Sequence, residues 1–137
     1  MKNKLSGFTI LELAIVVVII GILGTLGLAS FSAPREQSIE KEAIGNLKLM
    51  AAAEKIYRME NTAYIACANT AAVNTNLRLM FPTNDPNWKY RVVSISATNF
   101  SARAQRTSGF FAGNKRFCIN ATRDTPDTNT SNCGAAW

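Results

Sequence analysis

The most prominent feature of the sequence is an apolar run from Phe8 to Phe31 that contains a single charge, Glu12. No ionisable side chain occurs between Leu13 and Pro34. About twenty apolar residues, each rising roughly 1.5 Å, form a helix of about 30 Å, which matches the hydrocarbon core of a bilayer. The pattern therefore predicts a membrane-embedded helix along this run.

From Arg35 to Glu60 the pattern becomes amphipathic. Apolar residues recur at spacings of three and four, the period of one helix face: Ile39, Ala43, Leu47, Met50, Ala53 and Tyr57. Glu54 and Arg58 have the i, i+4 spacing of a favourable charged pair. We expect this helix to continue the apolar one with a bend at Pro34, and to end at Asn61-Thr62. Its apolar stripe should cover a sheet.

Three short segments, 88–95, 100–105 and 116–121, alternate between apolar and polar residues. The alternation predicts antiparallel strands, the first two joined by a hairpin at Ala97-Thr98-Asn99. The residues expected to face inward are Trp88, Tyr90, Val92, Phe100, Ala102, Ala104, Phe117 and Ile119. Residues 61–87 are rich in Asn, Thr and Ala, and we expect a loop there with a short helical turn at Leu77–Phe81.

Three short strands cannot bury their apolar face alone, so the amphipathic helix must supply the second layer. The predicted fold class is therefore α+β, with a long N-terminal spine helix on a small antiparallel β-meander. The first half of that helix is the membrane-embedded part.

The composition excludes several kinds of catalysis. The 137 residues include no histidine, the commonest general base and metal ligand. No phosphate-binding loop motif is present, and no carboxylates pair convincingly. We therefore expect a protein that is not an enzyme, with no catalytic residue, metal site or cofactor. The length leaves room for one domain beyond the apolar helix.

Glu12 needs a physical explanation, because an acid in hydrocarbon costs about 2.5 to 3.5 kcal/mol on insertion scales. One explanation is a cationic partner, since paired charges in low dielectric are far less costly than unpaired ones. The other is a position at the membrane interface near a helix N-terminus, where the macrodipole favours an anion. On these physical grounds alone the two explanations are close to equal.

The seven residues before Phe8 are short and basic and end in Gly7. This leader, followed by Phe8, by Glu12 and by the apolar run, resembles the type IV prepilins and the related pseudopilins of type II secretion. The resemblance covers Met1 to about Leu28. It implies cleavage by prepilin peptidase after Gly7, N-methylation of Phe8, and pairing of Glu12 with the amino terminus of a neighbouring subunit. It also implies three parts: a leader at 1–7, a transmembrane and assembly half of the spine helix at 8–33, and an exported pilin-like globular domain at 34–137.

Two other signals compete for the same segment. A secretory signal peptide would have a shorter apolar region of about 7 to 15 residues, followed by an Ala-x-Ala cleavage site. The apolar run here is longer, and no Ala-x-Ala lies at its end. A plain single-pass membrane anchor would require no particular residue at position 7, 8 or 12. In each case Lys2 and Lys4 hold the leader in the cytoplasm, so the rest of the chain lies outside.

The sequence has three cysteines, Cys67, Cys118 and Cys133. In an exported domain, oxidising conditions favour one disulfide with one thiol left over. We favour Cys118–Cys133, because the intervening segment is turn-rich with no packing signal of its own, and because many type IV pilins tie a C-terminal loop to the sheet with a disulfide. Cys67 is an alternative partner for either.

Charge gives weak guidance about partners. The formal charge of +6 falls to +4 without Lys2 and Lys4, which leaves 13 basic against 9 acidic residues. Basic and aromatic residues alternate in one region, a pattern found in single-strand nucleic-acid binders: Arg103, Arg106, Phe110, Phe111, Lys115, Arg116 and Phe117. We favour core phenylalanines with solvated cations, so a nucleic-acid partner is compatible with the sequence but unsupported.

The resemblance implies a structural subunit of a type IV pilus, assembled as a homo-oligomeric filament by machinery in the inner membrane. The precursor would lie in the inner membrane and the product in an extracellular filament. The first alternative is a pseudopilin in a periplasmic pseudopilus, but the major pseudopilin typically carries a calcium loop, and Asp124 and Asp127 form no convincing ligand set. A single-pass anchored binding module is the less favoured alternative.

Overall fold

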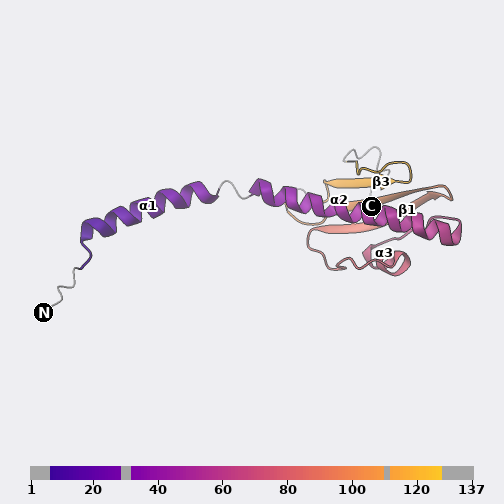
Figure 1. The fold of residues 1–137 in the computed structure, drawn as a ribbon, viewed down its shortest axis with the longest axis horizontal. Helices are drawn as coiled ribbons and strands as arrows, with labels where there is room; N and C mark the ends of the chain where they lie inside the picture. The colour runs from indigo at the N-terminus through magenta and orange to yellow at the C-terminus, as the bar shows by residue number, and fades with distance from the viewer. Residues whose placement is uncertain (1–6, 29–31, 110–111, 128–137) are drawn as a thin grey trace. The chain divides into compact units, whose positions relative to one another are not determined.

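The computed structural model describes residues 7–28, 32–109 and 112–127. The chain divides into two compact units, Met1–Ser38 and Ile39–Trp137. Figure 1 shows two helices at the start of the chain, α1 (Ile10–Leu28) and α2 (Ser32–Asn61), and a small sheet in the second unit. Helix α2 begins in the first unit and carries Pro34 in its first turn, where the missing N–H leaves no hydrogen bond unmade.

The predicted helices are confirmed over the described residues, but a membrane-embedded half is not shown. Within the part of the chain that the structure describes, no helix reaches both the length and the hydropathy of a membrane span. Residues 29–31, where the two helices were expected to be continuous, lie outside the described residues.

The sheet of the second unit has the predicted meander order β1-β2-β3. Its strands are β1 (Trp88–Ser96), β2 (Asn99–Arg106) and β3 (Arg116–Asn120), all antiparallel. Two isolated bridges extend it, Cys67 to Val92 beside β1 and Cys118 to Asp127 beside β3. The edges of the outer strands are therefore partly paired by segments outside the named strands.

Helix α2 packs its predicted stripe on the inner face of this sheet, as Figure 1 shows for the second unit. All eight residues expected to face inward from the strands are buried: Trp88, Tyr90, Val92, Phe100, Ala102, Ala104, Phe117 and Ile119. Two polar bonds fix the helix in place. The Trp88 indole Nε1 donates to the Ile39 carbonyl at 2.9 Å, and the Asn46 amide donates to the Tyr90 hydroxyl at 2.9 Å. The α+β fold is thus confirmed.

The predicted helical turn at Leu77–Phe81 is wrong in position. The structure instead has a helix, α3 (Thr70–Leu77), that ends where the turn was expected to begin. The Asn69 side chain accepts from the Ala72 N–H at 2.9 Å and caps its start, and Arg78 ends it in a left-handed conformation with φ 54°. Local capping therefore sets the limits of this helix, in a segment with little apolar periodicity.

Candidate functional site

The residues of the N-terminal motif lie in the first unit, at the start of α1. Gly7 and Phe8 are exposed and precede the helix, and Phe8 retains 80% of its surface. A side chain added at Gly7 would meet nothing within 4 Å, so the fold itself does not require glycine there. The bond between these two residues is therefore open to an enzyme. Residues 1–6 lie outside the described residues.

Glu12 makes a reciprocal cap with Thr9. Its Oε2 accepts from the Thr9 backbone N–H at 3.0 Å and from the Thr9 hydroxyl at 2.9 Å. The Glu12 N–H in turn donates to the Thr9 hydroxyl oxygen at 3.3 Å. This is the arrangement of a capping box, in which the first and fourth residues satisfy each other's free N–H groups. Sequence reasoning missed this role, although the Thr-x-x-Glu spacing signals it.

Helix α1 is apolar on all of its faces, and its described large side chains are exposed. Exposure runs from 46% at Val16 to 92% at Ile10. The set comprises Ile10, Leu11, Leu13, Ile15, Val16, Val17, Val18, Ile19, Ile20, Ile22 and Leu23. A helix that is hydrophobic all round is normally covered by other helices or by lipid. The exposed apolar surface of α1 is thus suited to contact with lipid or with other helices on every side.

Only one cysteine of the predicted Cys118–Cys133 disulfide lies among the described residues. Cys118 is buried in β3, whereas Cys133 lies outside the described residues, so the pair remains a prediction. Cys67 is a free, fully buried thiol that accepts from the Asn76 amide at 3.7 Å. Burial raises the pKa of this thiol, which favours the unreactive protonated form.

The predicted Glu54–Arg58 pair is wrong, because Glu54 is fully buried. Its Oε2 accepts from the Ile65 N–H at 3.2 Å, while its Oε1 is buried without a hydrogen bond. Burial raises the pKa of Glu54 to about 7, and the bond from Ile65 only partly offsets this effect. Arg58 instead donates to the Tyr64 hydroxyl at 3.3 Å and lies over the Tyr64 ring.

The basic and aromatic residues between 103 and 117 do not share one surface. Phe117 is in the core, Arg106 lies over the Trp88 ring at 5.4 Å, and Lys115 forms an ion pair with Glu40. The core position expected for the phenylalanines is thus confirmed for Phe117, while Phe110 and Phe111 lie outside the described residues. Arg103 and Arg116 lie on the outer face of the sheet.

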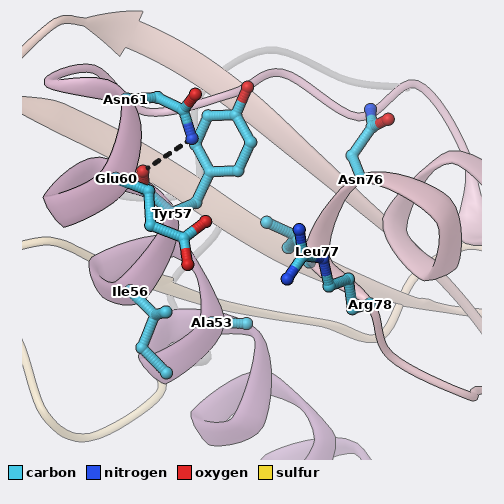
Figure 2. Close-up of a pocket in the computed structure, with 8 residues that line it drawn as sticks. All are labelled: Ala53, Ile56, Tyr57, Glu60, Asn61, Asn76, Leu77 and Arg78. Carbon is cyan, nitrogen blue, oxygen red and sulfur yellow. Dashed lines mark hydrogen bonds between the residues drawn. The ribbon is translucent and has the colours of Figure 1, made fainter.

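A pocket of about 240 Å³ lies between the last turns of α2 and the end of α3. Figure 2 shows its lining: Ala53, Ile56, Tyr57, Glu60, Asn61, Asn76, Leu77 and Arg78. Asn61 is held by a bond from its amide to the Tyr57 carbonyl at 3.1 Å, drawn as a dashed line. The lining offers one carboxylate, from Glu60, and one guanidinium, from Arg78, but no nucleophile beside a base.

The two aspartates considered for a calcium loop are engaged in ion pairs. Asp124 pairs with Lys55 at 3.5 Å, and Asp127 pairs with Arg123 at 2.5 Å. Among the described residues, no three His, Cys, Asp or Glu side chains gather in a way that could hold a metal ion.

Comparisons with known proteins identify relatives of the chain. A stretch of 63 residues, 46% of the chain, is 38% identical to the type II secretion system core protein G of Pseudomonas aeruginosa and covers 44% of that protein. The core protein G of Aeromonas hydrophila is 32% identical over the same length, with 44% of that protein covered. The type IV major pilin protein PilA of Myxococcus xanthus is 41% identical over 63 residues, which are 29% of that protein.

The chain thus spans less than half the length of the curated relatives that it matches. No family model matches the chain. The leader, Phe8 and Glu12 resemble two groups of proteins, the type IV pilins and the type II secretion pseudopilins. The relatives include core protein G of type II secretion and a type IV major pilin. Over the matched stretch, the chain is therefore similar both to type II secretion core protein G and to a type IV major pilin.

Proposed function

We propose that the chain is a structural subunit of a type IV pilus, processed after Gly7 and polymerised through α1. The observation that carries this proposal is the exposure of α1, whose apolar side chains face outward on every side around a single acid, Glu12. Before assembly, lipid would cover this surface and hold the precursor in the inner membrane. In the filament, the equivalent helices of neighbouring subunits would replace the lipid.

The charges at the start of α1 fit this assembly step. Cleavage after Gly7 would create an α-amine on Phe8, one helical turn from Glu12. The capping box uses only Oε2 of Glu12, and Oε1 accepts no hydrogen bond from any described residue. The second oxygen is therefore available to the amine of a neighbouring subunit, where pairing would offset the cost of both charges in an apolar core.

The choice between pilus and pseudopilus rests on a narrower observation. Asp124 and Asp127 form ion pairs with Lys55 and Arg123, and the sequence around them offers no convincing set of acidic calcium ligands, which favours a type IV pilus. The alternative is a pseudopilin, which the similarity to core protein G supports. In both, the chain would act as a building unit without catalysis. Its partners would be copies of itself, prepilin peptidase, and assembly machinery in the inner membrane. A disulfide between Cys118 and Cys133 would fasten the C-terminal loop.

Electron microscopy of cells with and without the chain tests this proposal. We expect surface filaments that contain the chain and that disappear when it is removed. Loss of type II secretion without loss of surface filaments would establish the pseudopilin alternative. A membrane-held monomer that forms no filament and supports no secretion would contradict both and would favour an anchored binding module.

A further inference from the structure

The segment 62–66 joins the end of α2 to the bridge between Cys67 and Val92, and it packs against the carboxyl of Glu54. It contains no helix and no strand. Its Ile65 N–H donates to the Glu54 Oε2 at 3.2 Å. Glu54 lies on α2 and is fully buried. The segment therefore helps to separate a titratable group from water.

One carboxyl oxygen of Glu54 has no partner. Oε1 is buried and accepts no hydrogen bond from any described residue. Burial raises the pKa of Glu54 to about 7, and the bond from Ile65 opposes this effect only in part. A protonated Glu54 places a neutral group in the core, whereas an ionised Glu54 leaves a charge there with a single hydrogen bond. Ionisation of Glu54 therefore works against its contact with the segment 62–66.

The described side chains around Glu54 and this segment provide no compensating positive charge. These side chains are Lys55 and Arg58 of α2, Tyr64 of the segment, Cys67 directly after it, Asn76 of α3, Val92 of β1 and Phe100 of β2. Lys55 pairs with Asp124, and Arg58 lies over the Tyr64 ring, so both cations are engaged elsewhere. Cys67 is a thiol whose pKa is raised first by burial and, to a smaller extent, by Glu54. The remaining groups are neutral, so these contacts favour the protonated form of Glu54.

The first residue of the segment is strained. Thr62 has a φ of 61°, a left-handed conformation that β-branched residues rarely adopt. This turn directs the chain back along α2 toward Glu54. At the other end, Cys67 and Val92 exchange two backbone hydrogen bonds of 2.8 Å each. A displacement of the segment 62–66 would thus release the strain at Thr62, while the bridge holds the following chain on the sheet.

Two cavities reach the turn of α2 that carries Glu54. The pocket of about 240 Å³ includes Ala53 and Tyr57, which precede and follow Glu54 on the helix (Figure 2). A second cavity, of about 420 Å³, is lined by Lys55, Arg58, Met59 and Tyr64. Both volumes exceed the space that a water molecule needs. Water would therefore reach Glu54 after a displacement of the segment 62–66, without unfolding of the sheet.

We propose that the segment 62–66 closes over protonated Glu54 and opens locally when Glu54 ionises, while the bridge at Cys67 and the sheet stay formed. This local opening concerns the second unit alone and is independent of the assembly role proposed for α1. In the open segment, Glu54 is hydrated and its pKa returns toward 4.5. Opening is therefore least favoured below pH 4.5, becomes more favoured as the pH rises, and levels off above pH 7.

Native-state hydrogen exchange of the full chain in detergent micelles, followed by NMR, tests this local opening. Each exchange rate divided by its intrinsic rate at the same pH gives an opening constant. The constant of the Ile65 N–H should rise roughly 70-fold from pH 5 to pH 8. It should not change in low urea, because little surface is exposed. The Cys67 N–H, which donates to the Val92 carbonyl, should exchange more slowly and only with the urea dependence of global unfolding.

Glu54→Gln removes the ionisation, so its Ile65 opening constant should not change with pH. Glu60→Gln is the matched control, at an exposed position of the same helix, and should keep the rise of the wild type. A wild-type Ile65 constant that is independent of pH, or that shares the urea dependence of Cys67 at every pH, would overturn the proposal. Persistence of the rise in Glu54→Gln would overturn it as well. If Glu54→Gln fails to fold, the pH and urea profiles of the wild type decide.

Discussion

Glu12 and Thr9 cap each other at the start of α1, with the Glu12 Oε2 only 2.9 Å from the Thr9 hydroxyl. The carboxylate therefore has a local structural role in addition to its expected pairing with a neighbouring amine. The two explanations for the acid that the sequence left open are thus compatible. One oxygen satisfies the helix N-terminus of its own chain, and the other is directed to no described residue.

The capping box separates the two roles experimentally. Glutamine also serves at the fourth position of a capping box, so Glu12→Gln should keep the cap and remove the charge. We expect this variant to insert and be processed but to lose filament assembly. Thr9→Ala keeps the charge and removes the side-chain cap, at a cost of about 1 kcal/mol in helix stability, and should still assemble. Electron microscopy and quantification of sheared filaments measure both outcomes. Wild-type filament yield from Glu12→Gln would contradict charge pairing.

Processing depends on Gly7, whose surroundings leave space for a side chain but whose proposed role is recognition by a peptidase. Gly7→Leu should therefore leave an uncleaved precursor in the membrane with no loss of folding. Asn3→Leu adds the same side chain elsewhere in the leader and should be processed normally. Mass spectrometry of the mature chain measures both. An N-terminus other than Phe8 in the wild type would rule out the proposed cleavage site.

The elements that the sequence predicted well are those with a strong local period. Trp88, Tyr90 and Val92 alternate along β1 and are all buried, as their spacing of two requires. Ala43, Leu47 and Met50 follow the helical period and are fully buried on α2. In these segments the burial of each residue follows from its own neighbours in the sequence, so periodicity was sufficient.

Glu54 shows where that reasoning fails. Its spacing from Arg58 favours an exposed pair, but the chain after α2 turns back at Thr62, with φ 61°, and places the Ile65 N–H against the carboxylate. The same segment brings Tyr64 to Arg58. These contacts depend on the path of a loop with little periodicity. The helix α3 was misplaced for a similar reason, since its limits depend on caps at Asn69 and Arg78.

The buried Glu54 predicts a stability that depends on pH. Its pKa is raised from 4.5 to about 7 in the folded chain, so between these values the folded chain holds a proton that the unfolded chain has released. The contribution of Glu54 to stability should therefore be fully present below pH 4.5, fall as the pH rises, and level off above pH 7. Between these two pH values, the free energy of unfolding should fall by roughly 3 kcal/mol because of Glu54.

Glu54→Gln removes this titration and keeps the size of the side chain. Urea unfolding of the full chain in detergent at several pH values should show that the variant gains stability relative to the wild type as the pH rises from 5 to 8. Glu60→Gln, at an exposed position of the same helix, should change little across this range. A constant difference between Glu54→Gln and the wild type would contradict a buried, protonated Glu54.

The three cysteines give the last prediction. Cys67 is free and buried in the core, whereas we propose that Cys118 pairs with Cys133. Alkylation of the unfolded, unreduced chain should therefore modify Cys67 alone. Cys133→Ser should lower the free energy of unfolding by about 3 kcal/mol, because the unfolded chain would no longer be constrained by the loop. Cys67→Ala leaves the proposed bridge intact and should lower the free energy of unfolding only through lost packing. A reducing agent should destabilise this variant by as much as it destabilises the wild type. Labelling of Cys118 or Cys133 in unreduced protein would show that the bridge is absent, because a bridged sulfur cannot be alkylated.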